Sequence, residues 1–121
     1  MKSDLPDRSF RFAVEIVDFC KYLQKNSDVS GVLVKQLLRS GTSVGANIQE
    51  GQSSQSDADF LNKYSISCKE CRETLYWLKL VNATEPTCVN VETVLNEANE
   101  LVAILTTIVK KMKAKKMKFE V

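Results

Sequence analysis

The chain has 121 residues, 44% of them hydrophobic, and a formal net charge of +2, which fits one globular domain with its own core. It contains no histidine, which excludes Ser-His-Asp and Cys-His catalysis and the Glu-x-x-His ligand pairs of di-iron bundles. We therefore expect neither enzymatic activity nor a small-molecule substrate. Because no apolar run approaches the roughly 20 residues that span a bilayer and the N-terminal stretch lacks a signal-peptide core, we expect a cytoplasmic protein without a membrane partner.

The first helix is predicted from Phe10 to Leu23, where apolar residues recur every three or four positions. Its expected core face consists of Ala13, Ile16, Val17, Cys20 and Leu23. The polar residues 26–31 follow and predict the first turn.

The stretch RSGTSVGANIQEG, residues 39–51, holds three of the four glycines of the chain, as a phosphate-binding loop would. It lacks the G-x4-G-K-[ST] pattern of such a loop, so we interpret it as part of a second helix that begins near Val32 and stops at Gly51. The core side of this helix is expected to hold Val34, Leu37, Leu38, Gly41, Val44, Gly45 and Ile48. Because Gly41 and Gly45 lack a Cβ, we expect close helix packing at both positions.

The opposite side of this helix carries Arg39, Ser43, Ala46, Asn47 and Glu50. One interpretation is a solvated surface. The other is a surface used by a partner or another subunit, because Ser and Asn are mediocre helix formers that an unconstrained surface would avoid. Both interpretations stay open.

The third helix is predicted to begin at Ser56 as N-cap and to run to about Leu80, before Pro86. Its core stripe is expected to consist of Phe60, Tyr64, Cys68, Cys71, Leu75 and Leu78. A second apolar stripe lies on the opposite side and is formed by Ile66, Tyr76, Trp77 and Leu80. Exposed aromatic patches usually mark interfaces, so this stripe predicts a homo-oligomer; the alternative is that Trp77 lies along a neighbouring helix of the same chain.

The fourth helix opens at Asn90, and its apolar residues alternate at three and four positions over three heptads. The stripe consists of Val91, Val94, Leu95, Ala98, Leu101, Val102, Leu105, Ile108, Val109 and Met112. Four amphipathic helices joined by short polar turns predict an all-α fold. Residues 1–121 should form one domain, an antiparallel up-down-up-down four-helix bundle.

Four cysteines are expected to be reduced in the cytosol: Cys20, Cys68, Cys71 and Cys88. Only Cys68 and Cys71 have C-x2-C spacing, and a zinc site would need the other two to converge from distant segments. We interpret all four as core or boundary thiols, and we expect neither a metal nor a cofactor.

Two stretches carry a family resemblance: RSGTSVGANIQEG, and FLNKYSISCKECRETLYWLKL at residues 60–80. Together they closely resemble the 23S rRNA intervening-sequence proteins, also called the four-helix bundle protein family. The motif R-S-x-x-S-x-x-A-N-I-x-E-G falls on Arg39, Ser40, Ser43, Ala46, Asn47, Ile48, Glu50 and Gly51. The resemblance implies a homopentamer of antiparallel bundles, and genes that for some members lie in sequences interrupting large-subunit ribosomal RNA genes. It implies no known activity.

Residues 110–118, KKMKAKKMK, form a lysine-rich C-terminal helix end without an acid. From Lys110 onward six lysines and one glutamate give +5, which leaves −3 for residues 1–109 out of the chain total of +2. Any RNA partner should therefore bind at the lysines, which are Lys110, Lys111, Lys113, Lys115, Lys116 and Lys118. The alternative is a solvated helix end that suits the helix dipole.

Two functional hypotheses follow from these features. The first is a non-catalytic oligomer that associates with RNA through its basic ends. The second is an oligomeric scaffold that binds a protein partner through the face of Arg39, Ser43, Asn47 and Glu50.

Overall fold

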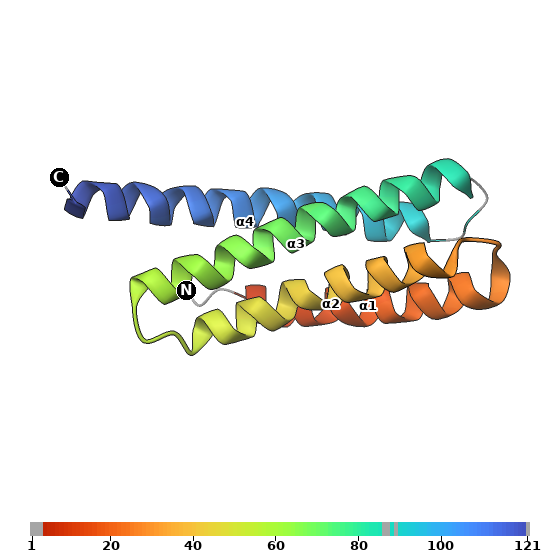
Figure 1. Cartoon of the computed structure of the whole chain (residues 1–121), viewed down its shortest axis with the longest axis horizontal. Helices are drawn as coiled ribbons and strands as arrows, with labels where there is room; N and C mark the ends of the chain where they lie inside the picture. Colours follow the sequence, from red (N-terminus) through yellow and green to blue (C-terminus); the bar gives the residue numbers. More distant parts are fainter. Residues whose placement is uncertain (1–3, 86–87, 89, 121) are drawn as a thin grey trace.

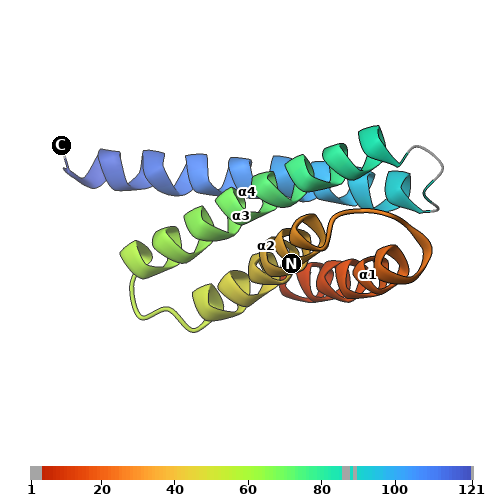
Figure 2. The ribbon, with the colours of Figure 1, turned by 45° about the vertical axis from the view of Figure 1, so that its right-hand side comes forward.

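The computed structural model describes residues 4–85, 88 and 90–120, with side chains described as far as Met117. Its helices are α1 (Leu5–Asn26), α2 (Gly31–Gln52), α3 (Asp57–Thr84) and α4 (Val91–Glu120). They run antiparallel in chain order, and each helix packs on the next one in the chain: α1 on α2, α2 on α3 and α3 on α4 (Figures 1 and 2). The predicted all-α four-helix bundle is confirmed.

Serine hydroxyls begin two of the helices. Ser30 accepts a hydrogen bond from the Val32 amide at 3.2 Å, and Ser56 accepts one from the Asp59 amide at 3.1 Å, so each satisfies an N–H of the first turn. The third helix runs about one turn further than predicted, to Thr84. Pro86, expected to stop it, lies outside the described residues.

The core face of α1 differs in part from the prediction. Ile16, Cys20 and Leu23 are buried, but Ala13 and Val17 are only half-buried. The helix also begins earlier than expected, and its buried face includes Leu5, Ser9, Phe12 and Phe19. Apolar residues cover much of this helix, so periodicity alone does not determine which side of α1 faces the core. Packing against the rest of the bundle determines that side.

Two expectations for α2 are wrong. Leu38 is 39% exposed, because it follows the fully buried Leu37 and is turned about 100° away from it around the helix. Gly51 does not end the helix, which continues to Gln52 with Ser53 as its cap. Gly51 is instead buried, and a Cβ there would lie 2.6 Å from Cε1 of the Tyr64 ring, so it is a third position of close helix packing.

An ion-pair cluster joins α1 to α4, the adjacent helices that approach each other least. Arg8 donates through Nε and Nη2 to the two carboxylate oxygens of Glu97, both at 2.8 Å, and Nη2 also donates to Glu100 at 2.7 Å. The Arg8 and Glu97 side chains are only 26% and 21% exposed. The hydrogen bonds from Arg8 lower the pKa of Glu97, whereas burial, reinforced by the charge of Glu97, raises the pKa of Glu15.

Replacing Arg8 by Gln should lower the free energy of unfolding by about 1 kcal/mol at neutral pH. Because the folded-state pKa of Glu97 is depressed, the pair stabilises the fold above the unfolded-state value of about 4.3. This contribution is lost as the pH falls through the folded-state value. Urea unfolding over a pH series should therefore show wild type and variant converging in acid.

The matched control is Lys21→Gln, which removes an exposed α1 charge that has no ion pair within the described part of the chain. A stability difference between Arg8→Gln and wild type that stays constant with pH would contradict the role assigned to Glu97.

Candidate functional site

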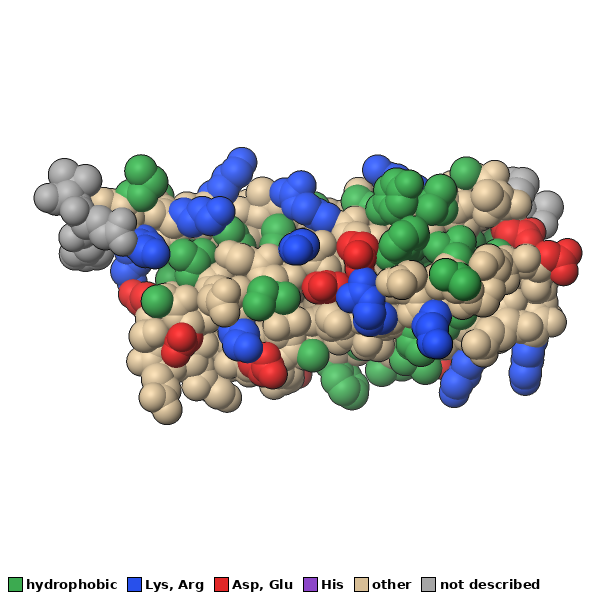
Figure 3. All heavy atoms as spheres, in the orientation of Figure 1, with side chains coloured by type: hydrophobic (Ala, Val, Ile, Leu, Met, Phe, Trp, Pro, Cys, Tyr) green, Lys and Arg blue, Asp and Glu red, His purple; other side chains and the backbone are tan. Residues whose placement is uncertain are grey.

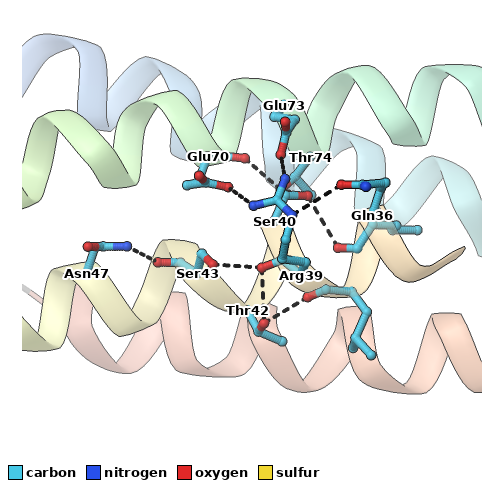
Figure 4. Close-up of polar contacts among 11 residues, drawn as sticks. Gln36, Arg39, Ser40, Thr42, Ser43, Asn47, Glu70, Glu73 and Thr74 are labelled. Atoms are coloured by element: carbon cyan, nitrogen blue, oxygen red, sulfur yellow. Dashed lines mark hydrogen bonds and ion pairs between the residues drawn. The ribbon is translucent and has the colours of Figure 1, made fainter. Parts of the chain in front are cut away.

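Arg39 connects α2 to α3 through two carboxylates. Its Nη1 donates to Glu70 at 3.0 Å, its Nη2 donates to Glu73, and its Nε donates to Gln36 at 3.2 Å (Figure 4). Glu70 and Glu73 are three residues apart and so share one face of α3. The guanidinium stays exposed, which places this network at the outer surface of the α2–α3 seam.

The other polar residues of the predicted face are also bonded within the chain. The Ser43 hydroxyl donates to the Arg39 carbonyl, and the Asn47 amide donates to the Ser43 carbonyl, each at 2.8 Å (Figure 4). Glu50 pairs with Lys63 of α3 at 2.9 Å. Arg39 and Glu50 thus bind side chains of α3, whereas Ser43 and Asn47 donate to backbone carbonyls of their own helix. Use of the same face by a protein partner stays a prediction.

Beneath Arg39, small hydroxyl residues bring α2 and α3 together. Ser40, Ser67 and Thr74 are fully buried. The Thr74 hydroxyl donates to the Ser40 hydroxyl at 2.9 Å, and the Ser67 hydroxyl donates to the Val44 carbonyl at 2.8 Å. Because both bonds cross from one helix to the other, they favour the register that places Ser40 beside Thr74 and Val44 beside Ser67.

Gly41 and Gly45 lie on the side of α2 that faces α1, and both are buried. A Cβ on Gly41 would lie 2.7 Å from Cγ2 of Ile16, and one on Gly45 would lie 3.1 Å from the Ser9 carbonyl oxygen. The backbones of α1 and α2 therefore approach each other where the sequence places glycine.

An apolar surface lies on the outer side of α3. Tyr76 is 56% exposed, while Ile66, Trp77 and Leu80 are half-buried. Figure 3 shows hydrophobic side chains gathered over the C-terminal half of this helix. The rings of Tyr76 and Trp77 meet edge to face with centroids 5.3 Å apart. Trp77 also packs against the core, yet its Nε1 is buried without a hydrogen-bond partner in the described residues.

The lysine-rich end of α4 extends past the start of α3 (Figure 1). With 30 residues α4 is about 45 Å long, compared with about 33 Å for the 22 residues of α1. Lys110, Lys111, Lys113, Lys115 and Lys116 are all exposed. Lys115 pairs with Asp57 at 3.1 Å, which ties this end to the first turn of α3. The side chain of Lys118 lies outside the described residues.

A family model described as 23S rRNA-intervening sequence protein matches residues 1–112, which include the α2 motif and the whole of α3. The chain belongs to this family. Among solved structures, a protein of unknown function from the S23 ribosomal protein family of Bacteroides thetaiotaomicron is 44% identical. Its TM-score is 0.80, and the similarity covers 88% of this chain and 98% of that one. No curated protein matches the chain.

Much of the lysine-rich end of the chain lies outside the family match. Lys110 and Lys111 are inside the matched residues, whereas Lys113, Lys115 and Lys116 follow residue 112. A role for the lysines after residue 112 therefore rests on their own chemistry and position, not on the family match.

Most of the cysteines are buried in the bundle. Cys20, Cys68 and Cys71 are buried, Cys88 is half-buried, and no disulfide joins any of these four described residues. Burial raises the pKa of Cys20 to about 11 and that of Cys71 to about 12, so neither is a thiolate at neutral pH. The described residues contain no group of three or more His, Cys, Asp or Glu side chains placed to hold a metal ion. Nor does any helix among them have the length and apolarity to cross a membrane.

The sequence interpretation missed the α3 partners of the motif. Glu70, Glu73 and Lys63 hold Arg39 and Glu50 in place, but only the register between α2 and α3 brings them together. The one signal in the sequence is the spacing of the two glutamates, one turn apart on the side of α3 away from its core stripe.

Proposed function

We propose that this protein is a non-catalytic homo-oligomer that associates with RNA through the lysine-rich end of α4. The observation that carries the proposal is the projection of this end past the start of α3, with its described lysines exposed to solvent (Figure 1). Ammonium groups attract phosphates but have no geometry for reading bases. Binding should therefore depend strongly on salt and little on RNA sequence.

Charge distribution supports the placement of RNA at this end. Residues 1–109 carry a net charge of −3, so the body of the bundle as a whole does not attract a polyanion. In a homo-oligomer several lysine-rich ends could contact one RNA strand, and linked weak sites bind more tightly than single ones.

Self-assembly is supported by two apolar surfaces on different helices. One is the outer surface of α3, where Tyr76 is 56% exposed beside the half-buried Trp77. The other is on α1, where Phe10 and Val14 lie one turn apart and are 63% and 45% exposed. A head-to-tail ring needs two different, complementary surfaces on each subunit. The family resemblance favours a pentamer.

Changing Lys113, Lys115, Lys116 and Lys118 to Gln should weaken binding to all RNAs alike and flatten its salt dependence. For single strands, the slope of log K against log salt falls by about 0.7 for each phosphate that is no longer neutralised. The measurement is fluorescence anisotropy of labelled RNAs of several sequences at about 50 and about 200 mM salt. Sedimentation should show an unchanged assembly, because these lysines lie beyond the apolar stripe of α4.

A matched control replaces four exposed lysines elsewhere, namely Lys21, Lys25, Lys35 and Lys79, none of which has an ion pair within the described chain. The control removes the same charge and should bind more tightly than the variant of the helix end. If the two variants bind RNA equally well, the lysine-rich end is only a solvated terminus. The protein scaffold built on the face of Arg39 would then be the better hypothesis.

A further inference from the structure

A groove between α3 and α4 is lined by cations from both helices. Lys69 and Arg72 come from α3, and Lys110 and Lys113 come from α4, around a volume of about 310 Å³. Cys68 and Val109 also line it, and no acidic side chain does. Figure 3 shows Lys and Arg side chains over the N-terminal half of α3 and the adjoining part of α4.

The four cations are spaced as two facing pairs. Each pair is three residues apart, which is about 4.5 Å along its helix. Arg72 Nη2 donates to Thr106 of α4 at 2.9 Å, so its guanidinium is held across the groove while its other N–H groups can still bind a ligand. Lys110 and Lys113 belong to the lysine-rich end of α4, so the groove is continuous with that end.

These cations differ from four other cations of the bundle that form ion pairs. Arg8, Arg39, Lys63 and Lys115 each pair with a carboxylate. By contrast, Lys69, Arg72, Lys110 and Lys113 have no ion pair within the described part of the chain. The nearest glutamates on α3, Glu70 and Glu73, are bound to Arg39 on the side facing α2. Unpaired like charges that share a groove repel one another, and an anion bound there would relieve the repulsion.

We propose that this groove holds the phosphodiester backbone of single-stranded RNA, and that Lys69 and Arg72 extend the lysine-rich end of α4 into a continuous cationic track. The inference rests on the proposed RNA association and adds α3 to the site. The groove is too small for a duplex to enter, and no aromatic side chain lines it for base stacking. The contacts are therefore made to phosphates, without selection among bases.

The test measures binding of a short labelled polyuridine strand to the full chain by anisotropy at about 50 and about 200 mM salt. Lys69→Gln with Arg72→Gln should bind about tenfold more weakly at the lower salt than the control Lys21→Gln with Lys35→Gln, which removes the same charge from α1 and α2. Its salt slope should fall by about 0.7 for each phosphate left without a cation. The single change Lys69→Glu should weaken binding more than Lys69→Gln does, because it adds a negative charge, and it breaks no side-chain bond within the described part of the chain.

The outcomes distinguish the groove inference from the proposed RNA association through the lysine-rich end. If the Lys69 and Arg72 variants bind like the control while the Lys113–Lys118 variant is weakened, the groove inference is overturned and the lysine-rich end stands. If wild type does not bind the strand at all, both are overturned. Equal competition by duplex RNA of the same length would refute the single-stranded assignment. Thermal unfolding of each variant, expected to match that of wild type, shows that weaker binding does not reflect an unfolded chain.

Discussion

Replacing Gly41 by Ala should lower the free energy of unfolding by about 1–3 kcal/mol, although alanine is the better helix former by about 1 kcal/mol. The added Cβ would lie 2.7 Å from Cγ2, 2.8 Å from Cγ1 and 3.2 Å from Cβ of Ile16. Ile16 is fully buried, and these atoms sit at the branched base of its side chain, where rotation cannot move them all away. The backbones of α1 and α2 would have to separate.

A double-mutant cycle tests this explanation against a general effect of substitution in the core. Ile16→Ala alone should cost about 2–5 kcal/mol, because it leaves a cavity. In that background the two closest carbons, Cγ1 and Cγ2, are gone and only Cβ at 3.2 Å remains, so Gly41→Ala should become nearly neutral or stabilising. Urea unfolding of the four proteins gives the coupling energy, and additive effects would show that the Ile16 contact is not what requires glycine.

Substitutions at two other glycines provide comparisons for Gly41→Ala. Gly45→Ala should also destabilise, but by less than Gly41→Ala, because the nearest atom to its Cβ is the Ser9 carbonyl oxygen at 3.1 Å. Gly31→Ala is the control, since no atom lies within 4 Å of its Cβ, and it should leave the stability undiminished. A rise in melting temperature for Gly41→Ala would contradict the close packing of α1 on α2.

The fold could be predicted from the sequence because each helix has its own periodic pattern of apolar residues. In α4, polar residues separate the apolar stripe cleanly, and its inner members Ala98, Leu101 and Leu105 are all fully buried. The rotation of α1 was less open to prediction, because Phe10, Phe12, Val14 and other apolar residues occur on several of its sides. In α1 the buried side is set by contacts with neighbouring helices, and the periodicity of one helix carries no information about those contacts.

The candidate site also has a part that could be predicted from the sequence and a part that could not. That Arg39, Ser43, Asn47 and Glu50 share one side of α2 follows from helical geometry alone. The carboxylates that hold Arg39, and the pairing of Lys69 and Arg72 with the lysines of α4, depend on the register between helices. Buried contacts such as Ser40 with Thr74 help to select that register. A single sequence does not reveal such contacts, because serine and threonine are more often exposed.

Replacing Trp77 by Ala should release smaller species from the assembled protein, because removal of a central aromatic anchor commonly costs about 2 kcal/mol or more at an interface. The exposed Tyr76 ring, whose centroid lies 5.3 Å from that of Trp77, places Trp77 within the apolar surface of α3. Sedimentation velocity over a range of micromolar concentrations measures the change.

Trp77 also packs against the core of its own chain, so its removal could unfold the bundle rather than separate subunits. Tyr76→Ala distinguishes these effects, because more than half of the Tyr76 side chain is exposed and its removal should hardly change unfolding of the subunit. It should nevertheless reduce assembly, whereas Met117→Ala, which removes a similarly exposed apolar side chain from the end of α4, should not. A wild-type protein that sediments as a monomer at micromolar concentration would refute the oligomer. Normal assembly of Tyr76→Ala would instead place the subunit contact on a different surface, with the α1 surface of Phe10 and Val14 as the next to test by the same measurement.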